Sequence, residues 1–129
     1  MATLSRKLVT FIEDTPAVLM ARVMGVDNAA VTTSTISTIT CNVYDETGTA
    51  PDTAVVSPAQ VVATVVKDTL QTDARWTEDS TGYNFISTIA ATGFPTGNHR
   101  YRVEFKFTDT SANVFWVIFE GPATALRTS

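Results

Sequence analysis

Hydrophobic and polar positions alternate most strictly in residues 99–108. Odd positions carry a ring or an apolar group, and even positions carry a charge or a hydroxyl group. A period of two places the two sets on opposite faces of an extended strand. The pattern predicts an amphipathic strand with one face in the core of an antiparallel sheet and the other face in water.

The same pattern predicts about seven to nine short strands along the chain, separated by turn residues roughly every ten positions. The clearest are residues 7–13, 17–24, 39–45, 53–56, 60–67, 83–90, 99–108 and 114–120. Residues 114–120 are expected to form a hairpin with 99–108 and to stop at Gly121-Pro122. This number and spacing of strands favours an all-β fold, an Ig-like antiparallel β-sandwich.

Three segments do not follow a simple alternation. Residues 31–38 are rich in Thr and Ser, which indicates a solvated loop or edge strand; the alternative is an adhesive edge that pairs with another chain. Residues 68–79 are irregular and are expected to hold a short helix or a long crossover. The expected strands 17–24 and 114–120 are apolar on both faces, so an intermolecular surface is expected at one or both.

Composition supports one folded domain over residues 1–129, with an N-terminal arm at 1–6 and a C-terminal tail at 122–129. The chain is 44% hydrophobic and 17% charged, unlike a disordered segment, and Thr is its commonest residue. The net charge of −4 argues against a nucleic-acid partner. No apolar run is long enough for a membrane span or a signal peptide, so we expect no membrane partner and folding in a reducing cytosol.

Few residues suggest chemistry. His99 is the only histidine and is expected to be structural, on the inward face of its strand. Tyr101 is expected to form a tyrosine corner, in which its hydroxyl bonds to upstream backbone. Cys41 is the only cysteine, so it is expected to be a small buried hydrophobe. With no phosphate loop or nucleophile motif, we expect no enzyme and no cofactor.

The irregular stretch 68–79 leaves two alternatives open. Its acidic residues could hold calcium through oxygen ligands, although a solvated loop with no metal is expected; these residues are Asp68, Asp73, Glu78 and Asp79. Trp76 lies among them and is expected to plug an end of the core; the alternative is an exposed ring for sugar stacking or protein contact. Phe115 and Trp116 are adjacent, so one should face the core and the other the outer surface.

Three segments together carry a resemblance to a known group of proteins. They are Ile39-Thr-Cys-Asn-Val-Tyr-Asp45, Trp76 with Gly82-Tyr-Asn-Phe85, and Gly97-Asn-His-Arg-Tyr-Arg-Val-Glu-Phe105. Their layout over residues 7–121 resembles small Ig-like β-sandwich proteins encoded among the structural genes of tailed bacteriophages. The chain lacks the Cys…Trp…Cys arrangement of antibody-type domains, so only the general architecture is implied.

The resemblance implies a non-enzymatic virion protein that is assembled in the host cytoplasm. A capsid decoration or stabilising protein is the first expectation, and a head–tail connector, tail or baseplate accessory protein is the alternative. The implied partners are major capsid or tail proteins, together with further copies of the chain in a homo-oligomer. The candidate contact residues are Arg6, Lys7, Leu19, Arg22, Trp76, Phe115 and Trp116.

A function of another class also fits the sequence. A carbohydrate-binding sandwich would use exposed aromatic rings as stacking platforms, and Trp76, Tyr83 and Trp116 are the candidates. This alternative requires at least one of the three rings to be exposed.

Overall fold

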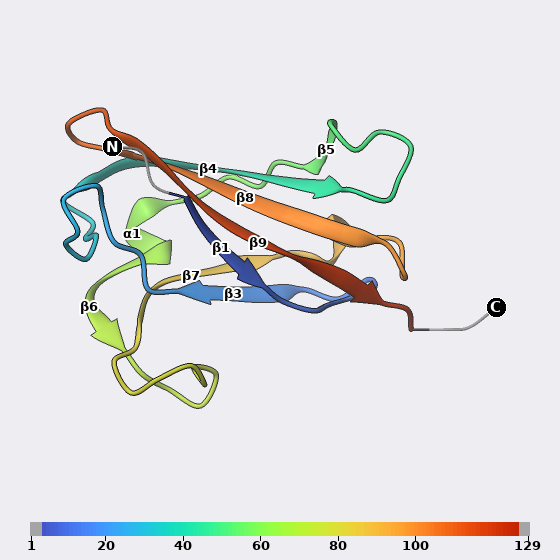
Figure 1. Cartoon of the computed structure of the whole chain (residues 1–129), viewed down its shortest axis with the longest axis horizontal. Helices are drawn as coiled ribbons and strands as arrows, with labels where there is room; N and C mark the ends of the chain where they lie inside the picture. The colour runs from blue at the N-terminus through green and yellow to red at the C-terminus, as the bar shows by residue number, and fades with distance from the viewer. Residues whose placement is uncertain (1–3, 127–129) are drawn as a thin grey trace.

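The computed structural model describes residues 4–126, which form two β-sheets packed face to face (Figure 1). The larger sheet has the order β1-β9-β8-β4-β5, with β2 also paired to β9, and the smaller sheet has the order β3-β7-β6. The strands are β1 (Leu4–Leu8), β2 (Phe11–Ile12), β3 (Ala17–Ala21), β4 (Ile36–Asp45), β5 (Ala54–Val56), β6 (Val66–Gln71), β7 (Tyr83–Ile89), β8 (Arg100–Asp109) and β9 (Val114–Thr124). Two short helical segments are α1 (Val62–Val65) and η1 (Ala91–Gly93).

The order of the strands is that of an Ig-like sandwich. Strands β9, β8, β4 and β5 follow the order G-F-C-C′, and β3, β7 and β6 follow the order B-E-D. Neighbouring strands are antiparallel except that β1 and β2 run parallel to β9. The all-β sandwich predicted from the alternation of residues is therefore confirmed.

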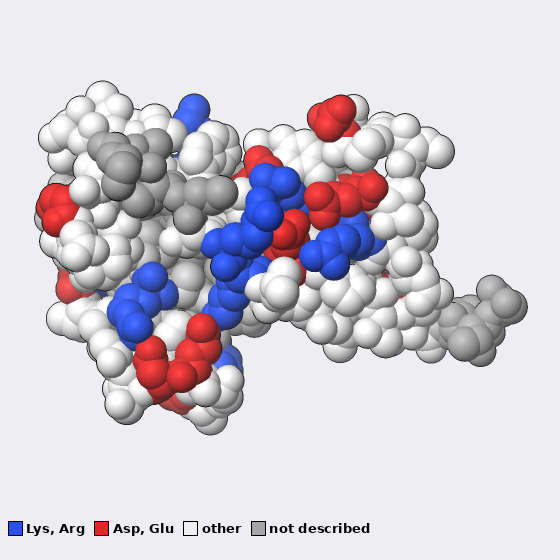
Figure 2. All heavy atoms as spheres, viewed as in Figure 1, with Lys and Arg blue, Asp and Glu red and all other residues white. Residues whose placement is uncertain are grey.

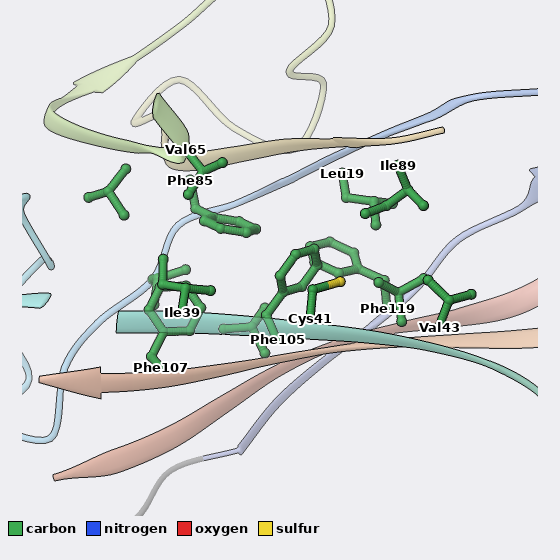
Figure 3. Packing of buried hydrophobic residues seen from close by; sticks show 14 of the residues in the cluster. Leu19, Ile39, Cys41, Val43, Val65, Phe85, Ile89, Phe105, Phe107 and Phe119 are labelled. Carbon is green, nitrogen blue, oxygen red and sulfur yellow. The ribbon is translucent and has the colours of Figure 1, made fainter. Parts of the chain in front are cut away.

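The core lies between the two sheets and is built on the inward face of β8. The side chains of Val103, Phe105 and Phe107 are fully buried there. The ring of Phe105 meets Phe85 of the smaller sheet edge-on at 4.8 Å between centroids, and meets Phe119 of β9 at 5.8 Å (Figure 3). The period-two pattern of residues 99–108 thus predicted the correct face for the core.

His99 differs from this expectation. It precedes β8, and its side chain is 29% exposed rather than packed in the core. Its Nδ1 lies 2.7 Å from a carboxylate oxygen of Asp45 at the end of β4. The residue joins two strand ends at the rim of the sandwich, so its structural role agrees with the sequence while its inward orientation does not.

The predicted tyrosine corner is present at the start of β8. The hydroxyl of Tyr101 donates to the carbonyl oxygen of Thr96 at 3.2 Å and accepts from the Thr96 amide at 2.9 Å. The buried ring also packs edge-on against Phe94 and Phe11. The corner therefore fixes the loop before β8 to the core.

Strand β9 continues past the predicted stop at Gly121-Pro122 and ends at Thr124. The amide of Ala123 donates to the carbonyl of His99 on the β8 side. Because successive residues of a strand direct their backbone groups to opposite edges, the nitrogen of Pro122 faces β1 and β2 instead. The missing N–H of the proline thus leaves the β8–β9 ladder intact.

The predicted strand 7–13 is divided into two strands, β1 and β2, by a break at Val9 and Thr10. The break lies opposite Pro122, which has no donor to offer there. Val9 still donates to the carbonyl of Glu120, and its own oxygen lies so close to Gly121 that a Cβ on that glycine would sit 1.6 Å away. A glycine is therefore required for this close approach.

The predicted terminal segments are shorter than expected. Residues 4–6 belong to β1 rather than to an arm, and residues 122–124 belong to β9 rather than to a tail. Residues 1–3 and 127–129 lie outside the described residues. The parallel pairing of residues 4–8 with β9 is a long-range contact that local sequence does not reveal.

Two other predicted boundaries are corrected, and one predicted segment is confirmed. Residues 60–67 contain the helical turn α1 before β6 begins, because the chain crosses there from the larger sheet to the smaller one. Residues 17–24 form a strand only as far as Ala21. The Thr-rich segment 31–38 is a loop up to Thr35 and then the start of β4, which pairs only with β8 there because β5 reaches no further than Val43 and Tyr44, so the expected loop or edge strand is confirmed.

Replacing Phe105 with Ala tests the core. The fully buried ring would leave a cavity, so we expect the free energy of unfolding to fall by about 3–5 kcal/mol in urea denaturation. Replacing the exposed loop residue Thr49 with Ala is the control and should change it by less than about 0.5 kcal/mol. Equal small effects at both positions would contradict the assignment of the faces of β8.

Replacing Tyr101 with Phe tests the corner without creating a cavity. Loss of both hydrogen bonds to Thr96 should lower the free energy of unfolding by about 1–2 kcal/mol. The matched control is Tyr44→Phe, because the Tyr44 hydroxyl makes no hydrogen bond within residues 4–126. Thermal denaturation of both variants gives the comparison, and equal losses would show that the corner contributes little.

Candidate functional site

The outward face of the larger sheet gathers most of the features that could recognise a partner. Because odd residues of β8 fill the core, its even residues point away from it. Strand register places the even residues of β9 and β1 beside them. We call this surface the β1–β9–β8 face; its residues are Arg6, Leu8, Arg100, Arg102, Glu104, Lys106, Trp116, Ile118, Glu120 and Pro122.

Cations lie outside carboxylates on the β1–β9–β8 face. The Arg6 side chain is 48% exposed, whereas that of its partner Glu120 is 10% exposed, and the two meet at 3.2 Å. Arg102 lies 2.7 Å from Glu104, which is also the less exposed member of its pair. Figure 2 shows the result as a stripe of Lys and Arg atoms down the middle of this view with acidic atoms beside it. The charges presented outward are thus mainly positive.

Apolar groups accompany these charges. Ile118 points outward yet is only 2% exposed, and its register partners on the two neighbouring strands are Arg6 and Glu104, whose long side chains have aliphatic stems that can lie over an apolar neighbour. The half-buried ring of Trp116 lies 5.9 Å from the ammonium group of Lys106. The expected double-sided apolar character of residues 114–120 is therefore partly covered from within the chain.

One part of the face remains uncovered. Leu8 is 73% exposed, and together with Pro122 it lines a shallow hollow beside β9. Arg100, whose side chain is about half exposed, and Glu120 line the same hollow. An exposed apolar side chain beside polar groups is a typical feature of protein contact sites.

A second cluster joins the two sheets at their β1 and β3 edges. The ammonium group of Lys7 donates to the carbonyl oxygen of Met20 at 2.8 Å, forms an ion pair with Glu78 and lies 4.9 Å from the centre of the Trp76 ring. The Trp76 ring packs against Tyr83 at 5.7 Å and is 9% exposed. Lys7 therefore fixes the 72–82 loop to both edges.

Trp76 is buried, as expected, but in a separate cluster rather than at an end of the main core. The cluster consists of Met20, Trp76 and Tyr83, with Ile86 packed against it. Met20 and Ile86 are register partners whose strand neighbours Leu19 and Ser87 are buried on the other side. The loop thus covers the outer face of the smaller sheet, and Tyr83 belongs to this cluster instead of the main core.

Carboxylates hold this loop in place. Asp79 accepts hydrogen bonds from the Trp76 indole at 2.9 Å and from the Gly82 amide at 3.0 Å, and Arg22 forms an ion pair with it. These donors hold the pKa of Asp79 well below its ordinary value. Hydrogen bonds from Arg75 and then from Tyr83 lower the pKa of Asp73 in the same way.

The acidic residues do not form a metal site. No group of three or more His, Cys, Asp or Glu side chains within residues 4–126 is arranged to hold a metal ion. Asp68 is instead bound to the amide and hydroxyl of Thr33, and Glu78 is paired with Lys7. The calcium alternative therefore has no geometric support among these residues.

Cys41 lies in the core, as predicted, at 3% exposure. Burial raises the pKa of its thiol to about 12, so the thiolate that nucleophilic chemistry requires is not formed near neutral pH.

The sequence-derived contact residues are distributed over several sites. Leu19 and Phe115 are corrected from contact residues to core residues, being 3% and 2% exposed, because both lie on inward faces of their strands. Arg6 and Trp116 lie on the β1–β9–β8 face. Lys7, Arg22 and Trp76 belong to the cluster around the 72–82 loop.

Three residues of the hollow were not predicted as contact residues from the sequence: Leu8, Arg100 and Pro122. The even positions of 99–108 placed Arg100 on an outward face that seemed only solvated. Leu8 and Pro122 become neighbours through the parallel pairing of β1 with β9, for which the sequence carries no local signal.

The chain was compared with family models, curated proteins and solved structures. No family model, curated protein or solved structure matches the chain. Within the described residues, no helix has the length and apolar character needed to cross a membrane.

Acid titration tests the carboxylates that hold the loop. Because the folded pKa of Asp79 is lowered, its stabilising effect is complete above the ordinary Asp pKa of about 3.9 and is lost as the pH falls toward the folded value. In a Trp116→Phe background, we expect constant Trp76 fluorescence from pH 7 to about pH 4 and a change below it.

Asp79→Asn should remove part of this acid dependence and alter the fluorescence already at pH 7. The exposed loop substitution Asp52→Asn is the control and should leave the profile in place. An acid profile unaffected by Asp79→Asn would show that other groups hold the loop.

Proposed function

We propose that the chain is a non-enzymatic structural protein of a tailed-phage virion, a capsid decoration protein that stabilises the head. The observation that carries the proposal is the β1–β9–β8 face, where an exposed leucine and half-exposed arginines lie on a rigid sheet. Arginine and exposed apolar groups on such a surface suit contact with another protein. The resemblance of residues 7–121 to phage sandwich proteins supplies the class of partner.

A small sandwich suits this role physically. The main core and the cluster of Met20, Trp76 and Tyr83 bury both faces of β3 in part, so we expect the subunit to be folded before it meets a particle. The remaining exposed groups would then add binding energy without a folding step. The proposed partners are major capsid protein and further copies of this chain. A head–tail connector, tail or baseplate position uses the same surface and is the alternative.

Binding to purified heads that lack this protein tests the proposal. We expect saturable co-sedimentation at a fixed number of copies per head, and a higher temperature of head disruption after binding, because a ligand stabilises the state that it binds. Albumin at the same concentration is the control for trapping in the pellet. Binding to purified tails or baseplates alone would favour the alternative position, and binding to no particle would contradict a virion role.

A carbohydrate-binding function is the second candidate. Trp76 and Tyr83 are buried, so of the three rings proposed for stacking only Trp116 is half-exposed. A glycan array on the wild-type chain and on Trp116→Ala tests it. Signals that disappear in the variant would support sugar binding, and an array without signals would contradict it.

A further inference from the structure

We infer that the hollow between Leu8 and Pro122 on the β1–β9–β8 face binds an acidic protein loop, one that inserts an apolar side chain between two carboxylates. The inference rests on the proposed function for the identity of the partner and adds the chemistry by which that partner is recognised. It requires two properties of the surface, an apolar contact and an outward cationic field, and the structure carries both.

The apolar contact is local and rigid. Leu8 is the most exposed of the large hydrophobic side chains in residues 4–126, at 73%. It lines a hollow together with Pro122 and Gly121 of β9, and the backbone of Val9 packs directly against Gly121. Single exposed leucines are ordinary on protein surfaces. A leucine beside a proline-walled hollow on the paired strands of a sheet instead offers a preformed seat for one side chain.

The outward positive charge arises because, in each ion pair of this face, the basic side chain is more exposed than its carboxylate partner. Arg6 is 48% exposed above Glu120 at 10%, and Arg100 is 47% exposed above Glu46 at 31%. The carboxylates thus hold the guanidinium groups in place from below. Four of the nine Lys and Arg residues of a chain with net charge −4 lie on this one face. Figure 2 shows a stripe of Lys and Arg atoms down the middle of this view, with acidic atoms beside it.

The same pairs favour a carboxylate partner over a nucleic acid. A guanidinium group has five N–H donors, and the pairing with one carboxylate leaves several of them free to bind another. A polyphosphate backbone would instead approach Glu120 and Glu104 at every step along the stripe and would gain no apolar contact at Leu8. A short acidic loop with one apolar side chain meets both features over a few residues only, and the one carboxylate that lines the hollow, Glu120, is paired with Arg6.

Titration of the 15N-labelled chain with a peptide probes this surface directly. The probe is the capped pentapeptide Glu-Glu-Leu-Glu-Glu, and the comparisons are Glu-Glu-Ser-Glu-Glu, Lys-Lys-Leu-Lys-Lys and a thymidine oligonucleotide of equal charge. We expect saturable amide shifts at Leu8, Arg100 and Gly121 with the first peptide and weaker binding of the other three. Tighter binding of the oligonucleotide, or equal binding of the serine peptide, would overturn the inference.

Matched substitutions on the two sheets separate the site from a general charge effect. Arg100→Glu and Leu8→Ser alter the face, whereas Lys67→Glu and Leu70→Ser make the same changes on β6 of the smaller sheet. All four are compared at equal ionic strength after thermal denaturation has shown that each is folded. We expect each face variant to bind the peptide about tenfold more weakly and each β6 variant to bind it as the wild type does. Equal losses on both sheets would overturn the inference.

The same four variants applied to heads distinguish this inference from the proposed function. If the wild type and the two β6 variants bind heads and Arg100→Glu and Leu8→Ser do not, the result supports both the inference and the proposed function. Wild-type binding that the face variants also keep overturns only the inference. Peptide binding without head binding supports the inference and contradicts the capsid role. The wild type could also associate with itself through this face. Self-association that is lost in the face variants and is not inhibited by the peptide would identify a second copy of the chain as the occupant and would overturn the inference.

Discussion

The alternation of residues along β8 is the constraint on which the structure depends. Tyr101, Phe105 and Phe107 occupy one side of this strand and fill the space between the sheets. A shift of one residue in register would exchange its two faces and place charges in the core. The strand lies inside the larger sheet between β4 and β9, so its register also fixes theirs. Core and candidate contact surface are therefore two consequences of one pattern.

Elements governed by such local patterns could be predicted from the sequence. Residues 99–108 alternate clearly and form β8, and the apolar residues of 83–90 with the turn before them located β7, although Tyr83 lies in the outer cluster rather than beside Phe85 in the main core. The position of Tyr101 at a Gly-rich corner also predicted its hydrogen bonds to Thr96. In each of these cases, the side-chain periodicity and the turn residues agree with the tertiary structure, so that local and global preferences coincide.

Where tertiary context decides, the sequence predictions were less accurate. Residues 60–67 carry the β-branched side chains of a strand, but the crossing between sheets requires a helical turn there. Pro122 is an ordinary strand breaker, yet β9 continues through it because its nitrogen faces the break between β1 and β2. Of the contact surface, the outward charges of β8 were predictable. The hollow at Leu8 was not, because it depends on parallel pairing between distant segments.

The contact between Lys7 and the carbonyl oxygen of Met20 has a consequence for how the subunit behaves among its own copies. Strand β3 is an edge strand, and free backbone acceptors on such an edge invite pairing with another chain. The ammonium group occupies one of these acceptors and places a charge where an incoming strand would have to lie. Pairing of another chain edge to edge along β3 is thereby made less favourable.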